Sequence, residues 1–236
     1  GIYWSIKYHG EPEDTTKHTY NQAFAIYALS SYYEASKEEE ALEMAKELFH
    51  VIEERCMDET GYQEAFDKEF KEIENENGVI AQKTMNTLLH VFEAYTELYR
   101  VAGLPEVKER LKWIMDTFAS RVYNPVLHRQ EVFFDAQMTS ILDLHSYGHD
   151  IETAWLIDRG VEVLGEKEYE EKMNPITRDL TEQIYQVAFD GHSLANECEK
   201  GVVNVHRVWW VQAETVVGFL NGYEKTGREE DLTAAQ

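Results

Sequence analysis

Apolar and charged positions follow one pattern in four long segments of the chain. Each segment begins with a stretch that is apolar nearly all round. After a small turn residue it continues into a stretch with charge on one face. This periodicity predicts α-helices in both stretches, the first kind buried and the second facing solvent. The predicted helix pairs are 20–35 with 38–55, 85–101 with 105–122, 149–164 with 167–187, and 212–226 with 229–236.

Small turn residues recur between the two helices of each pair at a nearly constant interval. Gly103, Gly165 and Gly227 are spaced 62 residues apart, and Ser36 precedes Gly103 by 67 residues. A fixed interval of this size indicates repeated helical hairpins, and glycine after the last apolar residue is the expected cap where φ is positive. The repeat predicts an all-α fold with an inner and an outer layer. Hairpins closed into a ring would form an (α/α) barrel, and the alternative is an open solenoid.

Long connections, rich in polar and aromatic residues, lead from each charged helix to the next apolar one. Segments 61–66 and 130–135 have the composition of short β-hairpin pieces with turns. Connections of this length are usually functional or disordered, and their aromatic content argues against disorder. We expect them to gather beside the N-termini of the inner helices, within one domain that spans residues 1–236.

Charge and cysteine content exclude several classes of partner. The 236 residues carry 22 lysines and arginines against 45 aspartates and glutamates, a net charge of −23 that repels nucleic acid and anionic membranes. No apolar run approaches the roughly 18 residues of a membrane-spanning helix. Cys56 and Cys198 fit neither a zinc spacing nor a disulfide framework, which indicates a reducing cytoplasm. The sequence begins at Gly1 in the middle of a patterned stretch, and its last residues lie inside a helical pattern without a cap. We therefore expect both ends to be truncated.

The starts of the predicted inner helices are rich in polar and aromatic side chains. These stretches are 17–22, 83–90, 145–152 and 206–214. A single histidine at a helix start is more often a cap or a satisfied core group than a functional residue. Four such stretches in register on a ring would converge on one cavity, which favours a closed barrel with a binding site at its mouth.

His149 and Glu152 are the strongest candidates for acid–base chemistry. Their i, i+3 spacing makes them neighbours on one helix face, and a nearby carboxylate orients an imidazole and raises its basicity. That arrangement suits a general base working near neutral pH. The alternatives are a surface ion pair on the first helical turn and a metal pair, although no further cluster of metal ligands is evident.

Trp209, Trp210 and Glu214 suggest a platform for a sugar. Aromatic faces stack on the apolar C–H face of a pyranose, while carboxylates and amides bind its hydroxyls. The alternative for either tryptophan is a place in the core under the inner helix.

A second set of candidates lies in the first half of the chain. Asn86 and His90 are spaced i, i+4 and share one face of the second inner helix. Trp4 and Tyr20 are weaker platform candidates.

Four ordered motifs resemble the cellobiose 2-epimerase branch of the N-acylglucosamine 2-epimerase superfamily. KTMNTLLHVFEAY at 83–95 is similar to the family's KTMNTHLHxLEAY, and SYGHDIETAW at 146–155 to SYGHDIEASW. WWVQAE at 209–214 and YNQAFAIY at 20–27 resemble family motifs too. The resemblance spans essentially the whole chain. It implies an (α/α)6 barrel without a cofactor, of which residues 1–236 are the central portion.

The resemblance also implies a reaction and a role for each candidate residue. The family interconverts glucose and mannose at the reducing end of β-1,4-linked disaccharides through ring opening and a cis-enediolate. This chemistry needs two proton carriers on opposite faces and donors for the enediolate oxygen. By resemblance, His149 is one acid/base with Glu152 as its partner, and His90 stabilises the enediolate. The residues expected to contact the sugar are Tyr20, Phe24, Asn86, Trp209, Trp210 and Glu214.

The chain departs from the family pattern in two respects. Leu88 stands where the family's THLH has its first histidine. The family's second acid/base histidine, in a WKCPYHxxR-type motif after the tryptophan pair, is absent, and so is an arginine motif near the family's N-terminus. With one proton carrier where two are needed, we expect residues 1–236 alone to be inactive or nearly so. If they are active, His90 or His206 would be the substitute acid.

Other functions stay open on the sequence. An N-acylglucosamine 2-epimerase or a mannose isomerase would use the same barrel. A glycoside hydrolase would need Glu152 and Glu214 to flank a glycosidic bond, which leaves His149 without a role. A non-catalytic domain would bind sugar without exchange at C2. In each case we expect a small-molecule sugar as the ligand, a disaccharide for the epimerase, and no metal, nucleic acid or membrane partner.

Overall fold

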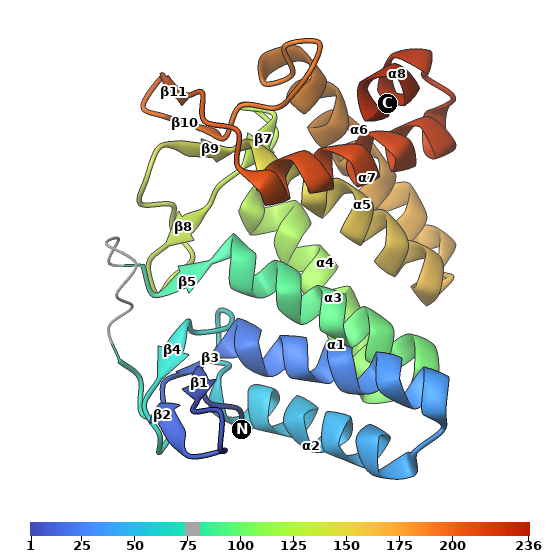
Figure 1. Ribbon diagram of the computed structural model, residues 1–236. Helices are drawn as coiled ribbons and strands as arrows, with labels where there is room; N and C mark the ends of the chain where they lie inside the picture. The colour runs from blue at the N-terminus through green and yellow to red at the C-terminus, as the bar shows by residue number, and fades with distance from the viewer. Residues whose placement is uncertain (74–80) are drawn as a thin grey trace. The chain divides into compact units, whose positions relative to one another are not determined.

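The computed structural model describes residues 1–73 and 81–236, and this part of the chain is mainly helical (Figure 1). By the packing of their Cα atoms, the residues form two compact units. The first unit contains residues 1–114 and 133–141, and the second contains residues 115–132 and 142–236. The assignment of residues 1–236 to one domain stays a prediction.

The predicted helical hairpins are confirmed. The helices are α1 (Thr19–Ser36), α2 (Glu39–Arg55), α3 (Met85–Ala102), α4 (Pro105–Thr117), α5 (Tyr147–Leu164), α6 (Lys167–Val187), α7 (Trp209–Thr226) and α8 (Glu229–Ala235). Helix α1 begins one residue before its predicted start. Helices α5 and α7 begin two and three residues early, because the polar and aromatic residues of their first turns resemble loop composition. The predicted helix 105–122 ends as α4 at Thr117 and continues as a π-helical turn, η1 (Phe118–Val122).

The turn between the two helices of each hairpin has the predicted left-handed conformation. Gly103, Gly165 and Gly227 have φ angles of 63°, 67° and 71°, which glycine adopts without steric cost. In the first hairpin the helix runs through Ser36, and Lys37 takes the left-handed position with φ 61°. The repeat that the residue spacing indicated therefore corresponds to one conformation, a left-handed residue that ends the first helix of each hairpin.

The first unit is built on α1, which packs against both α2 and α3 (Figure 1). The outer helix α2 is amphipathic, as predicted, and turns one apolar face inward. Its buried side chains recur at helical spacing: Ala41, Leu42, Ala45, Leu48, Phe49 and Ile52. At roughly 25 cal/mol per Å² of apolar surface, this burial is the main term that holds the hairpin together.

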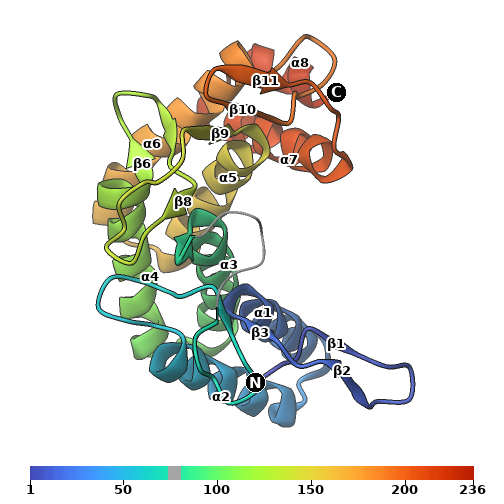
Figure 2. The same ribbon diagram turned by 90° about the vertical axis from the view of Figure 1, so that its left-hand side faces the viewer.

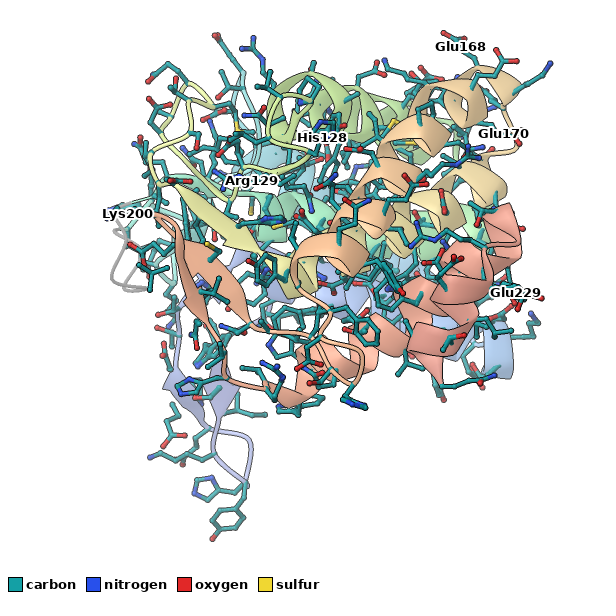
Figure 3. All side chains as sticks on the ribbon, turned by 90° about the horizontal axis from the view of Figure 1, so that it is seen from above. His128, Arg129, Glu168, Glu170, Lys200 and Glu229 are labelled. Atoms are coloured by element: carbon teal, nitrogen blue, oxygen red, sulfur yellow. The ribbon has the colours of Figure 1, made fainter. Side chains whose placement is uncertain are left out.

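The second unit is built on α5, which packs against α6 and α7. The outer helix α6 has a solvent-exposed face, from which Glu168 and Glu170 project (Figure 3). At the far end of the inner helix, the buried Asp158 carboxylate accepts hydrogen bonds from Thr177 of α6, at 2.8 Å, and from Asn221 of α7, at 2.7 Å. Burial raises the pKa of Asp158 above its usual value. Among the described helices, none is both long and apolar enough to cross a membrane.

The expectation that every inner helix is buried is wrong for α1 and α7. Inner helices α3 and α5 are largely buried, whereas the other two expose apolar side chains. Phe24 and Tyr32 of α1 are 40% and 58% exposed, and Val216 and Leu220 of α7 are 48% and 42% exposed. The apolar pattern describes what a helix can bury, and the helices packed against α1 and α7 in this chain cover only one side of each.

Short strands form the connections, as predicted for segments 61–66 and 130–135. The strands are β1 (Ser5–Ile6), β2 (Pro12–Asp14), β3 (Lys17–His18), β4 (Ala65–Phe66), β5 (Lys83–Thr84), β6 (Tyr123–Asn124), β7 (Arg129–Gln130), β8 (Phe133–Phe134), β9 (Leu144–Ser146), β10 (Glu197–Glu199) and β11 (Val202–Asn204). Strands β3, β5 and β9 lead directly into α1, α3 and α5, and each pairs with a strand of another connection. These pairings hold the connections beside the inner-helix N-termini within each unit.

Two further features of the connections lie in the first unit. The hairpin of β1 and β2 projects from this unit (Figure 2). A buried lysine joins two of the connections. Nζ of Lys83 donates to Asp58 and to the hydroxyl of Thr60 in one connection, and to the carbonyl of Ala136 in another at 2.8 Å. A buried ammonium is tolerated only with this degree of pairing, so Lys83 fixes the entry to α3.

Candidate functional site

A continuous row of aromatic side chains runs over the first unit. Trp4 lies 5.1 Å from His18 between ring centroids, and His18 stacks on Tyr20 at 5.3 Å. Tyr20 meets Phe24 edge-on at 6.2 Å, and Phe24 lies 4.6 Å from the ring of His90. Trp4 is 49% exposed and Phe24 is 40% exposed. A partly exposed aromatic strip of this kind offers flat apolar faces to a sugar.

His90 ends this row on the second turn of α3, close to an acidic neighbour. Its Nδ1 atom lies 3.0 Å from Oε2 of Glu93, and the two side chains are 13% and 16% exposed. Asn86 lies one turn earlier, on the first turn of the same helix, where the hydroxyl of Thr84 caps α3 by accepting from the Thr87 amide at 3.1 Å. The structure thus places Tyr20, Phe24 and His90 in one row.

A buried carboxyl group lies beneath the starts of α1 and α3. Glu64, in the connection before β4, is 4% exposed, and its Oε1 accepts from the Thr84 hydroxyl at 2.9 Å. Its backbone carbonyl accepts from the amide of Thr19 at 3.0 Å. Burial raises the pKa of Glu64 to about 7, although the hydrogen bonds from Thr84 oppose the shift. Burial, followed by the charge of Glu64, raises the pKa of Tyr20.

His149 occupies the first turn of α5 in the second unit. Its Nδ1 atom lies 2.6 Å from Oγ of Ser146, the residue before the helix, and its ring centroid lies 4.9 Å from that of Trp210. The side-chain amide of Gln130 donates to the His149 carbonyl at 3.2 Å. The imidazole is therefore held by a hydroxyl on one nitrogen and by an indole against its ring.

The close approach of Trp210 to α5 depends on a glycine. A Cβ atom added to Gly148 would lie 2.6 Å from Cη2 of Trp210 and 2.7 Å from Cγ2 of Val211. Trp210 is half-buried against the core of this unit, whereas Trp209 is 80% exposed. A core position, the alternative considered for either tryptophan, is therefore excluded for Trp209 within the described chain.

Glu214 and Glu152 lie on facing helices of the second unit. Oε2 of Glu214, on α7, accepts a hydrogen bond from the indole N–H of Trp155, on α5, at 2.7 Å. Glu152 is 8% exposed, one turn after His149 on α5. Because the side chain is buried, a surface ion pair is excluded as an account of Glu152.

A second histidine anchors the start of α5. Nε2 of the buried His145 lies 2.8 Å from Oδ2 of Asp150, which is fully buried, and the amide of Gln130 donates to Oδ1 of Asp150 at 3.0 Å. Nearby, burial followed by the interaction with Cys198 raises the pKa of Tyr147 to about 12. No group of three or more His, Cys, Asp or Glu side chains within the described residues is arranged to hold a metal ion.

The candidate residues fall into two sets, one in each unit. Tyr20, Phe24, Asn86 and His90 belong to the first unit, and His149, Glu152, Trp209, Trp210 and Glu214 belong to the second. The roles proposed for them from the sequence stay predictions.

Four neighbouring side chains with a part in the site were missed. Glu93 follows His90 by three residues, the same spacing as that of His149 and Glu152, so the sequence did indicate it. Trp155 is the last residue of a motif that was recognised. Glu64 is placed by the pairing of β3 with β4, which leaves no periodic signal. Ser146 lies three residues before His149 and was quoted within a motif, but its own contact was not recognised.

The comparison with known proteins agrees with these motifs. The sequence model of the family described as N-acylglucosamine 2-epimerase (GlcNAc 2-epimerase) matches residues 1–236. A cellobiose 2-epimerase of Eubacterium cellulosolvens is 47% identical over 255 residues, which cover 100% of this chain and 63% of that protein. The chain thus spans about three-fifths of the length of the curated relatives it matches.

Solved structures of the same group have the same fold. A sugar epimerase from a ruminal bacterium matches with a TM-score of 0.97 and 47% identity, over 100% of this chain and 61% of that one. Cellobiose 2-epimerase of Bacillus thermoamylovorans matches with a TM-score of 0.93 and 43% identity, over 100% of this chain and 62% of that one. These matches confirm the predicted (α/α)6 fold class. Together with the motifs on α1, α3, α5 and α7, they show that the chain belongs to the N-acylglucosamine 2-epimerase family.

Proposed function

We propose that the protein containing these residues is a cellobiose 2-epimerase, which inverts C2 of the reducing-end glucose in β-1,4-linked disaccharides. The observation that carries the proposal is the setting of His149. Its imidazole is hydrogen-bonded through Nδ1 to Ser146 and packed against Trp210, which fixes the ring on the first turn of α5. The identity of 47% to a cellobiose 2-epimerase supports the choice of substrate.

The reaction follows from one proton transfer and its reversal. In the ring-opened sugar, the imidazole of His149 takes the proton from C2. The C–H electron pair forms a C1–C2 double bond, and the aldehyde oxygen becomes the enediolate oxygen. Hydrogen-bond donors at that oxygen stabilise its charge. Rotation about C2–C3 then presents the other face, where a second acid returns a proton to C2.

The remaining candidates bind the sugar. The rings of Tyr20 and Phe24 supply apolar faces in the first unit, where Asn86 and His90 bind sugar oxygens. In the second unit, Trp210 and the exposed Trp209 supply stacking faces, and Glu214, oriented by Trp155, accepts sugar hydroxyls. Partly exposed rings beside carboxylate and amide groups suit a pyranose with its apolar C–H face and polar rim.

Two finer points belong to the same proposal. We place the enzyme in the cytoplasm, because Cys56 and Cys198 are free thiols. We also propose that it needs no metal, since side chains can carry every proton of the mechanism.

The test is a product assay with cellobiose on the natural full-length protein and on residues 1–236. Chromatography should detect the disaccharide with mannose at its reducing end from the full-length protein, with equal yield after dialysis against EDTA. If glucose is the only product, the epimerase hypothesis is wrong and the protein is a hydrolase that acts through Glu152 and Glu214. No product of either kind would contradict catalysis on this substrate. Activity of residues 1–236 alone would place the second acid within them.

A further inference from the structure

The chain contains a second pair of histidine and glutamate at the spacing that first drew attention to His149 and Glu152. On α3, His90 precedes Glu93 by three residues, and Nδ1 of the imidazole lies 3.0 Å from Oε2 of the carboxylate. Both side chains are largely buried, at 13% and 16% exposure. Phe24 packs 4.6 Å from the imidazole between ring centroids, so the ring is confined on a second side.

This contact determines which nitrogen carries the proton in the neutral imidazole. An ionised carboxylate only accepts hydrogen bonds, so the nitrogen that faces Glu93 must be an N–H. In neutral His90, Nδ1 therefore carries the proton and Nε2 keeps its lone pair. His149 differs, because its Nδ1 faces the Ser146 hydroxyl, which can either donate or accept.

We propose that Glu93 is a positioning residue, which holds neutral His90 in the Nδ1–H tautomer and so makes Nε2 the atom that accepts a proton from a sugar hydroxyl. The inference rests on the proposed function only for its sugar, and the tautomer stands apart from it. Neutral His90 then cannot donate to an enediolate. A sugar hydroxyl first passes its proton to Nε2, which breaks the O–H bond, forms the N–H bond and leaves the negative charge on that oxygen. The resulting imidazolium donates a hydrogen bond to the same oxygen. The negative charge of Glu93 stabilises that imidazolium.

The next turn of α3 offers a matched control. Glu97, four residues after Glu93, is 13% exposed and forms an ion pair with Arg100 at 2.7 Å. Glu93→Gln and Glu97→Gln therefore remove the same charge from equally buried positions on one helix. The first removes the carboxylate that faces Nδ1 of His90, and the second removes the partner of an arginine.

The deciding experiment is long-range 1H–15N correlation NMR on the natural full-length protein with 15N-labelled histidine. The His90 signals are identified by their loss in His90→Asn. In the unmodified chain at a pH where His90 is neutral, we expect a protonated Nδ1 and an unprotonated Nε2. Glu93→Gln should populate the Nε2–H tautomer, and Glu97→Gln should leave the spectrum unchanged. A protonated Nε2 in the neutral unmodified chain would overturn the proposal without any variant.

The role in catalysis has a separate readout. In the full-length protein, Glu93→Gln should lower kcat about 10- to 100-fold, as expected for loss of a group that orients a catalytic side chain. KM should change much less, and Glu93→Asp should restore part of kcat. Unchanged kcat for Glu93→Gln, with Glu97→Gln as the reference, would overturn the positioning role. An inactive unmodified protein would instead refute the proposed function and leave the NMR result standing.

Discussion

Burial of Glu64 should make the stability of the first unit depend on pH in an unusual direction. The side chain is 4% exposed, and burial raises its pKa from 4.5 to about 7. A carboxyl group whose pKa is raised on folding binds its proton more tightly in the folded state than in the unfolded state. Its contribution to stability is therefore complete below pH 4.5 and is lost as the pH rises through 7.

The magnitude follows from the two pKa values. One pKa unit corresponds to about 1.4 kcal/mol. In the folded chain Glu64 is almost fully protonated at pH 5 and mostly ionised at pH 8. Linkage then gives a loss of about 2.5 kcal/mol in the free energy of unfolding between these pH values from this one group. Glu64→Gln keeps an oxygen for the Thr84 hydroxyl and removes the titration, so the variant should lack this loss.

The assay is urea unfolding of the unmodified chain and of Glu64→Gln at pH 5, 6, 7 and 8. The free-energy difference between the two proteins should shift by about 2.5 kcal/mol in favour of the variant from pH 5 to pH 8. Thr84→Ser, which keeps the hydroxyl, serves as the control and should follow the unmodified chain. A difference that stays constant within about 0.5 kcal/mol, or that shifts the other way, would refute a buried Glu64 with a raised pKa.

Two further predictions concern the second unit. Gly148→Ala places a Cβ atom 2.6 Å from Trp210, so the indole should move away from His149 at a cost of about 1–3 kcal/mol in stability. Near-UV circular dichroism and urea unfolding measure this, and an unchanged aromatic spectrum would contradict it. Trp155→Phe removes the 2.7 Å donor to Glu214 and should weaken cellobiose binding about tenfold. Titration calorimetry on the full-length protein measures the affinity, and an unchanged Kd would show that Glu214 does not need Trp155.

The fold could be predicted from the sequence because its signals are local. The apolar spacing that defines a helix and the glycine that ends it both lie within a few residues, as at Gly103 and Gly165, and the structure has a left-handed turn at both. Exposure of Phe24 and Leu220 could not be predicted in the same way. Burial depends on which helix packs against that face, and the pattern of one helix does not contain that information.

The candidate site was predictable where its residues lie in recognisable motifs. His149 and Trp210 were identified from motifs, and the structure brings their rings together across α5 and α7. Glu64 was not found, because its contact with Thr84 joins two points of one long connection that lie 20 residues apart, and no periodic pattern marks it. The contact of Ser146 with His149 was missed for a different reason. A serine before a helix is an ordinary capping residue, and only the structure shows its hydroxyl on the imidazole instead.

The most direct test of the account is deuterium exchange at C2 of cellobiose in D2O, followed by NMR, with the natural full-length protein and with His149→Asn. The account predicts deuterium at C2 together with a mannose-configured product for the unmodified protein, and loss of both for His149→Asn. An epimerised product without deuterium at C2 would contradict proton removal to a solvent-exchanging base. Exchange that persists in His149→Asn would show that another residue removes the proton.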